Sequence, residues 1–254
     1  MKRILGVAAV LGVLALGTAP AHAGATVNPA CPATGVKGVM FDWDANCFAY
    51  ETAYNTGTFV STSGSKLVVV GKLTITCPPF DDLIPDALNE YTFVFDQLTS
   101  AGTPAPTVVG STTIWNCNYG TGRFRIFKDA ALDAPNACCM PAAPGGGTVI
   151  PEFENGTLIL QGTLPNFRTQ ITKTGTNPAN GSYKTDVYAY SPLGTLYSRT
   201  ATVIPDISQG LWCVTSGCVP ATYSAHPDGK FDAKYDPTTA SRTSTWGSIK
   251  MLYR

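Results

Sequence analysis

The sequence predicts an all-β fold, specifically a disulfide-stabilised antiparallel β-sandwich of the jelly-roll kind. Short apolar runs rich in Val, Ile, Thr, Phe and Tyr recur along the chain, and turn residues separate them. Helical stretches are few, and one of them, residues 81–90, is interrupted by Pro85. The chain also contains 8 cysteines, so we expect bridges between the strands.

The expected strands have the composition and length of β-structure. In chain order they read GVMFDWD, CFAYETAY, KLVVVGKLTITC, YTFVFDQL, TTIWNCNY, RFRIFKD, TLILQGTL, FRTQITKT, YKTDVYAY, TLYSRTATVI and STWGSIKMLY. Within residues 91–96 large aromatic side chains alternate with smaller or polar ones. That period of two is typical of a strand with one buried and one solvated face.

Three short stretches are expected to be turns between strands. AHPDGK, around His226, has Pro-Asp-Gly at its centre. Asn155 and Asn180 each precede a glycine, and Asn-Gly is a favoured pair in hairpin turns. Both asparagines also lie in Asn-x-Ser/Thr sequons, but the hairpin interpretation is favoured.

The first 23 residues, MKRILGVAAVLGVLALGTAPAHA, are expected to be a secretory signal peptide. Lys2 and Arg3 precede an apolar run that is shorter than the about 20 residues of a spanning helix. We therefore expect no membrane insertion after the leader is removed. Residues 24–254 are expected to form one β-rich domain, with a split inside the Pro- and Gly-rich stretch 134–151 as the alternative.

The charge pattern excludes nucleic acid as a partner. The chain has 17 basic and 17 acidic residues, only 13% of its residues are charged, and no basic run stands out. The leader and the cysteine content indicate a secreted, periplasmic or cell-surface location.

An even number of cysteines in an exported chain predicts up to four disulfides. Cys213 and Cys218 flank four turn-prone residues and are expected to pair. The adjacent Cys138 and Cys139 are expected to reach different partners, because a ring between neighbours is strained. The pairing of the remaining cysteines stays open; these are Cys31, Cys47, Cys77 and Cys117. No Cys-x-x-Cys occurs, which argues against thiolate metal sites.

One stretch has the opening of a calcium loop, but it fails as an EF-hand. Asp42, Asp44 and Asn46 fit the first three ligand positions. Cys47 stands where the loop needs glycine, and Ala53 stands where it needs glutamate. We therefore interpret the stretch as a strand.

A second acidic group follows the strand RFRIF and is the expected position of any metal. Asp129, Asp133 and Asn136 offer oxygen ligands in a loop at a strand end, where secreted β-proteins hold calcium. The alternative is that these residues only shape a turn. No other cofactor is expected.

Catalytic chemistry has little support. His226 is the only histidine after the leader, and although Ser224 and Asp228 are near, no Gly-x-Ser-x-Gly elbow exists. Glycan hydrolysis needs only two carboxyl groups. Glu152 and Glu154 would share one face of a strand.

Aromatic residues give a second possible function. Trp43, Trp115, Trp212 and Trp246 are able to form platforms for sugar rings, although tryptophans of a sandwich usually belong to the core.

Residues 90–172 resemble β-rich secreted proteins of bacteria, some of which carry an exosortase-type sorting tail. The resemblance rests on EYTFVFDQLTSAGT, GTGRFRIFKD and FENGTLILQGTL. Residues 244–254, STWGSIKMLYR, contain no Pro-Glu-Pro tripeptide of the kind found in such tails. The resemblance implies an exported β-protein and assigns no functional residue.

From these observations we expect a non-enzymatic structural or binding protein of the cell surface or extracellular space. A glycan or a surface protein is the expected partner. The alternatives are a carbohydrate-binding module and a carboxylate-based glycan hydrolase.

Overall fold

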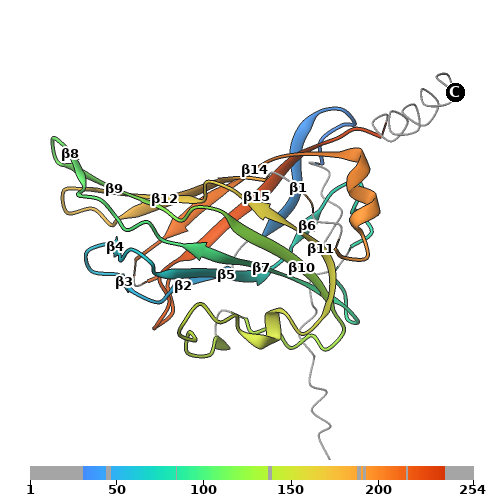
Figure 1. Cartoon of the computed structure of the whole chain (residues 1–254), viewed down its shortest axis with the longest axis horizontal. Coiled ribbons are helices and arrows are strands. Elements are labelled where there is room, and N and C mark those ends of the chain that lie inside the picture. The colour runs from blue at the N-terminus through green and yellow to red at the C-terminus, as the bar shows by residue number, and fades with distance from the viewer. Residues whose placement is uncertain are drawn as a thin grey trace, which may run out of the picture.

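The regular secondary structure of the computed structural model is almost entirely antiparallel β-sheet (Figure 1). It describes residues 31–43, 47–83, 85–136, 139–187, 190, 193–215 and 217–237. The expected leader, Trp246 and the expected strand STWGSIKMLY lie outside these residues. The strands are β1 (Lys37–Trp43), β2 (Cys47–Glu51), β3 (Tyr54–Asn55), β4 (Val60–Ser61), β5 (Lys66–Lys72), β6 (Ile75–Thr76), β7 (Glu90–Thr99), β8 (Thr107–Val109), β9 (Thr112–Asn118), β10 (Gly122–Asp129), β11 (Thr157–Leu164), β12 (Arg168–Thr174), β13 (Asn180–Asp186), β14 (Val203–Cys213) and β15 (His226–Tyr235).

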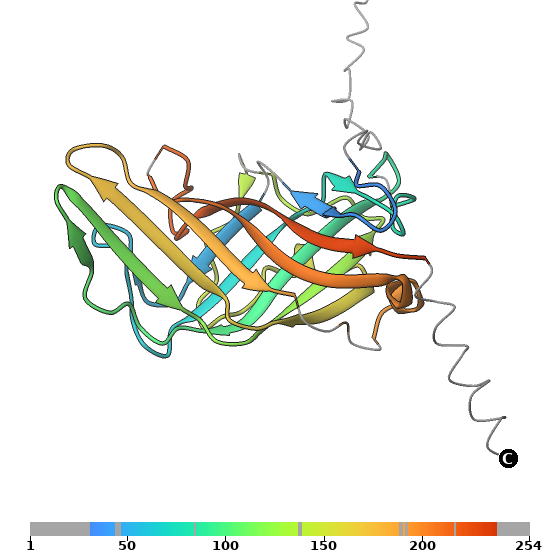
Figure 2. The ribbon, with the colours of Figure 1, turned by 90° about the horizontal axis from the view of Figure 1, so that it is seen from above.

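Two sheets form the sandwich that the sequence predicts. The larger has eight strands in the order β6-β1-β15-β14-β13-β12-β9-β8, and the smaller has five in the order β11-β10-β7-β5-β2. Strands β3 and β4 form a separate ribbon. Seen from above, β12 to β15 run side by side, and the strands of the smaller sheet cross behind them (Figure 2). Each sheet therefore buries its inner face against the other.

The space between the sheets is filled by aromatic rings. Trp43 is fully buried, and its ring centroid lies 4.6 Å from that of Phe93 and 5.5 Å from that of Phe231. Phe231 also contacts Phe124, with centroids 4.9 Å apart. These residues come from both sheets, so the core holds the two layers together through offset and edge-to-face ring contacts.

The outer face of the five-stranded sheet is also buried, which corrects the expectation of a solvated second face. Residues 134–136 and 139–153, here called the cover segment, lie beneath this sheet in Figure 1. Their apolar side chains, such as Val149 and Phe153, pack with Val70 and Val94 in a second hydrophobic cluster. Thr92 donates a hydrogen bond to the Phe153 carbonyl at 2.9 Å. The Pro- and Gly-rich stretch proposed as a possible boundary thus contacts the strands.

Two expected local structures are wrong. Most of TLYSRTATVI forms the 3-10 helix η3 (Tyr197–Thr202), and β14 begins only at Val203. The AHPDGK stretch is not a turn but the start of β15. The ladder between β1 and β15 ends at the pair Trp43–Gly229. Pro227 lies beyond this pair, so the N–H that proline lacks is not needed for a hydrogen bond to β1. Gly229 is needed for packing, because a side chain there would clash with Tyr183.

The Asn-Gly pairs also lie elsewhere than at hairpin turns. Asn180 is the first residue of β13 and pairs with Thr172. Asn155 lies between the 3-10 helix η2 (Pro151–Phe153) and β11. The preceding strand in the chain, β10, ends at Asp129, so Asn155 is not in a tight turn between two strands.

Two disulfides join described cysteines. Cys213 pairs with Cys218, as predicted, and Cys31 pairs with Cys77. Cys117 is a buried thiol whose sulfur lies 3.3 Å from the Ser100 hydroxyl. Cys138 lies outside the described residues. Within the described part of the chain, no helix has the length and apolarity needed to cross a membrane.

Candidate functional site: a cleft at one end of the sandwich

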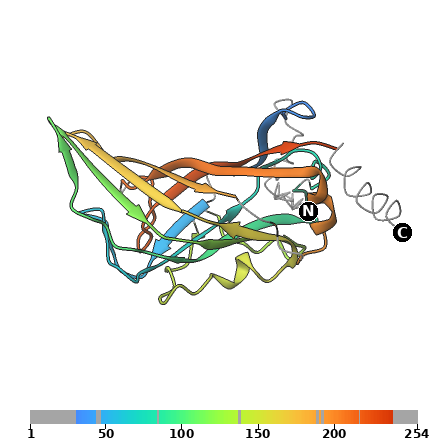
Figure 3. The same ribbon diagram turned by 45° about the horizontal axis from the view of Figure 1, so that its top comes forward.

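Three loops at one end of the sandwich enclose a cleft of about 770 Å³. Residues 51–59 form one wall, and residues 173–179 of the β12–β13 turn form another. Residues 214–215 and 219–224, after β14, form the third. At this end the β8–β9 hairpin diverges from the β3–β4 ribbon (Figure 3). The Cys213–Cys218 disulfide lies at the start of the third wall, where it restricts the loop. The volume falls within the range of small-molecule sites.

A carboxyl group lies within the cleft lining. Glu51 is the last residue of β2, and its side chain accepts hydrogen bonds from the Ser61 hydroxyl and, at 3.0 Å, from the Tyr119 phenol. Burial raises the pKa of Glu51, and the hydrogen bonds from Ser61, Ser65 and Tyr119 only partly offset this effect. Such a group gains from any further hydrogen-bond donor that enters the cleft.

A chain of hydroxyl groups holds the Glu51 carboxyl in place. The oxygens of the Ser61 and Ser100 hydroxyls lie 2.6 Å apart. The Thr52 and Ser65 hydroxyls lie 3.0 Å apart. These contacts fix the carboxyl before any ligand arrives, so little side-chain entropy remains to be lost on binding.

Aromatic side chains form part of the wall. Tyr54 and Phe59 both line the cleft, and Phe59 packs edge-to-face on Trp115 with centroids 5.2 Å apart. The Tyr54 hydroxyl is buried and has no hydrogen-bond partner among the described residues, and burial raises its pKa. An unpaired buried hydroxyl is costly, so the cleft contribution of Tyr54 is its ring rather than its hydroxyl.

Two residues of the lining have strained backbone. Phe59 has φ +57° and Thr222 has φ +73°, a region that large and β-branched residues rarely adopt. The Thr222 hydroxyl accepts a hydrogen bond from the Ala143 N–H of the cover segment at 2.9 Å, which helps to hold the conformation. Local strain of this kind is concentrated at functional sites.

The tryptophans divide between core and cleft. Trp43 and Trp212 are buried between the sheets, as the core interpretation predicts. Trp115 is half-buried and supports Phe59. Described tryptophans therefore provide no exposed platform, and the aromatic residues that line the cleft are Tyr54, Phe59 and Tyr223 instead.

The residues considered for catalysis are not arranged for it. The His226 ring stacks on Phe48 at 5.2 Å, and its Nε2 is buried without a partner among the described residues. Glu152 and Glu154 are not on a strand: the first lies in η2, and the second caps it and forms an ion pair with Arg125 at 2.7 Å. Glu51 is the only carboxylate among the described residues that line the cleft.

The predicted metal ligands lie far from the cleft. Asp129 ends β10 and Asp133 follows in the next loop, and the fold brings both next to Glu90 at the start of β7. Sequence reasoning missed Glu90, since only the pairing of Glu90 with Asp129 places it there. Asn136 lies further along the same loop, where its carbonyl accepts the Cys139 N–H at 2.9 Å. The 10 residues of β7 run from Glu90 toward the hydroxyl groups around Glu51. An extended strand of this length spans about 30 Å, which separates the carboxylates from the cleft.

Comparisons of the chain with family models, with curated proteins and with solved structures found no match.

Proposed function

We propose that this chain is an exported, non-enzymatic binding protein whose cleft takes a small saccharide. The observation that carries the proposal is Glu51, a half-buried carboxyl fixed by hydroxyl donors in the lining of a cleft of about 770 Å³. A saccharide presents many hydroxyl donors to such an acceptor and apolar ring faces to aromatic walls. Tyr54 and Phe59 supply those walls.

Export is supported by two independent features. The first 23 residues have the pattern of a bacterial secretory leader. The two disulfides, Cys31–Cys77 and Cys213–Cys218, are bonds that persist in oxidising compartments. A periplasmic, cell-surface or extracellular protein meets saccharides there without needing to enter the cell. The strand pattern shared with secreted bacterial β-proteins agrees with this location.

Binding is favoured over hydrolysis by the charges in the cleft. A glycosidase of the usual kind needs two carboxyl groups, one on each side of the bond, and Glu51 has no second carboxylate beside it among the described lining residues. Its raised pKa would suit a general acid, so the test of binding should include a test of turnover.

Calorimetric titration with cello-, chito-, xylo-, malto- and manno-oligosaccharides tests the proposal. We expect one of these series to bind, and Glu51→Gln to weaken binding about 10- to 100-fold, because a hydrogen bond to a charged group contributes about 1.5–3 kcal/mol. Tyr54→Ala should also weaken binding, since it removes an aromatic wall of the cleft. Glu152→Gln, in η2, is the matched control and should bind as the wild type does.

The same samples separate the other functions. New reducing ends that disappear in Glu51→Gln would make the protein a hydrolase. An absence of binding across all the series, together with self-association in light scattering, would instead favour a structural protein and contradict the proposal.

A further inference from the structure

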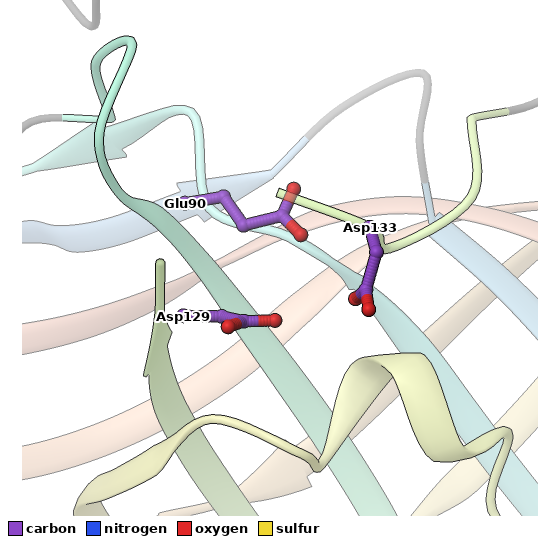
Figure 4. A group of neighbouring side chains, drawn as sticks. All are labelled: Glu90, Asp129 and Asp133. Carbon is purple, nitrogen blue, oxygen red and sulfur yellow. The ribbon is translucent and has the colours of Figure 1, made fainter. Parts of the chain in front are cut away.

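A cluster of three carboxylates lies at the edge of the five-stranded sheet, away from the cleft. Glu90 begins β7, Asp129 ends the neighbouring β10, and Asp133 lies in the loop that follows. One oxygen of each lies within 4.8 Å of the others. Figure 4 shows the side chains of Asp129 and Asp133 turned toward a common space that the Glu90 carboxyl group borders.

One oxygen of this cluster has no partner, which is unusual for a buried charge. Asp129 is only 6% exposed. Its Oδ1 accepts the Ala131 N–H at 2.8 Å, whereas its Oδ2 is buried and has no hydrogen-bond partner among the described residues. Buried carboxylate oxygens are normally paired or bound to a metal. We propose that Glu90, Asp129 and Asp133 bind one calcium ion.

The charged side chains at the three-carboxylate cluster sum to a net negative charge. Glu90 forms an ion pair with Lys72 at 2.8 Å and accepts the Ala134 N–H at 2.8 Å. Asp133 accepts hydrogen bonds from the Asn155 amide at 3.1 and 3.2 Å, and this donor is neutral. Three carboxylates and one ammonium leave two negative charges, which a divalent cation balances.

The ligand type and spacing favour calcium over other cations. All three side chains offer oxygen, which hard cations prefer, and none offers the nitrogen or sulfur that zinc and copper favour. Calcium binds oxygen at 2.3–2.6 Å, so two of its ligands lie at most about 5 Å apart, whereas the magnesium shell spans only about 4.2 Å. Oxygens within 4.8 Å of one another fit the calcium shell. Asp133 is exposed, so ions and water have a route to the site.

A bound ion would link the start of the cover segment to the five-stranded sheet. Ala134 belongs to the outer hydrophobic cluster, and its N–H is bound by Glu90. Asp133, immediately before it, would be tied by the ion to β7 and β10. Calcium should therefore stabilise the start of the cover segment, independently of any ligand in the cleft.

Thermal melts of the full-length mature protein, stripped with EDTA and titrated with calcium chloride, test the site. We expect the Tm of the wild type to rise with calcium and to respond little to magnesium at the same concentration. Asp129→Asn should abolish the calcium response. Asp186→Asn is the matched control, because Asp186 also accepts a hydrogen bond from an asparagine amide, that of Asn166, at 3.1 Å. The Tm of this variant should respond to calcium as the Tm of the wild type does.

The EDTA samples separate a metal site from a purely structural carboxylate. Asp129→Asn removes a buried negative charge, so in EDTA it should be at least as stable as the wild type, and only in calcium should the wild type be the more stable protein. An unchanged wild-type Tm in calcium would overturn the proposal, as would a loss of stability in Asp129→Asn that is the same with and without the ion. An equal response to magnesium would overturn the choice of calcium.

Discussion

The two disulfides close loops of very different length, so their removal should cost different amounts of stability. Cys31 and Cys77 are separated by 46 residues, and Cys213 and Cys218 by 5. The loop-closure entropy of the unfolded chain then gives about 4 kcal/mol for the longer loop and about 2 kcal/mol for the shorter. For a chain of this size these values correspond to falls in Tm of about 8–16 °C and about 4–8 °C.

The assay compares two double variants, Cys31→Ala with Cys77→Ala and Cys213→Ala with Cys218→Ala. Alanine is preferred to serine because Cys77 is 1% exposed and a hydroxyl there would need a partner. Urea titration followed by tryptophan fluorescence gives the free energy of unfolding of each variant. Cys117→Ala is the control, since it removes a buried cysteine that forms no disulfide.

Two results would refute this reasoning. If the short-loop variant loses as much stability as the long-loop variant, loop entropy does not govern the effect. If neither loses more than Cys117→Ala, the bridges contribute nothing, and their support for an oxidising compartment disappears.

Three further changes probe the cleft and the backbone. Burial raises the pKa of Glu51 above its ordinary 4.5, so the folded wild type holds this proton more tightly than the unfolded chain does. The wild type therefore loses stability as the pH rises above 4.5, and urea melts should show Glu51→Gln gaining stability relative to the wild type over that rise. Gly210→Ala would press a methyl group onto the backbone of β15 and should cost about 1–3 kcal/mol in the same melts, whereas Gly145→Ala, with open space around it, should change little. Gln97 is exposed with φ +60°, so Gln97→Gly should stabilise the fold by about 1 kcal/mol, and a lower melting temperature would contradict this.

The sequence predicts the inner face of the sandwich well, because that face follows a local period. The alternation in residues 91–96 places Phe93 and Phe95 between the sheets, where the structure has them. The cover segment has no such signal. Its apolar residues, among them Val149 and Phe153, are scattered between prolines and glycines, so only the three-dimensional structure reveals that they bury the outer face.

The predictability of the sites depends on how far apart their residues lie in the chain. The sequence predicts the Cys213–Cys218 pair because only a short turn separates the two residues, whereas the Cys31–Cys77 pair depends on the path of the chain. Asp129 and Asp133 share one loop, but Glu90 reaches them only through the β7–β10 ladder.

The cleft had no sequence signal at all, since its walls come from three separate loops. Pro-Asp-Gly at residues 227–229 predicted a turn because those residues favour turns, but packing under Tyr183 is the reason for the glycine.

The most direct test of the proposed function is to locate the bound saccharide on the protein. Amide chemical shifts of the ¹⁵N-labelled mature chain would be followed during titration with the oligosaccharide that binds best. We predict that the largest shifts fall in the three walls of the cleft, residues 51–59, 173–179 and 214–215 with 219–224. Shifts confined to the outer face of the eight-stranded sheet, around Lys184 and Leu211, or no shifts with any member of the panel, would contradict it.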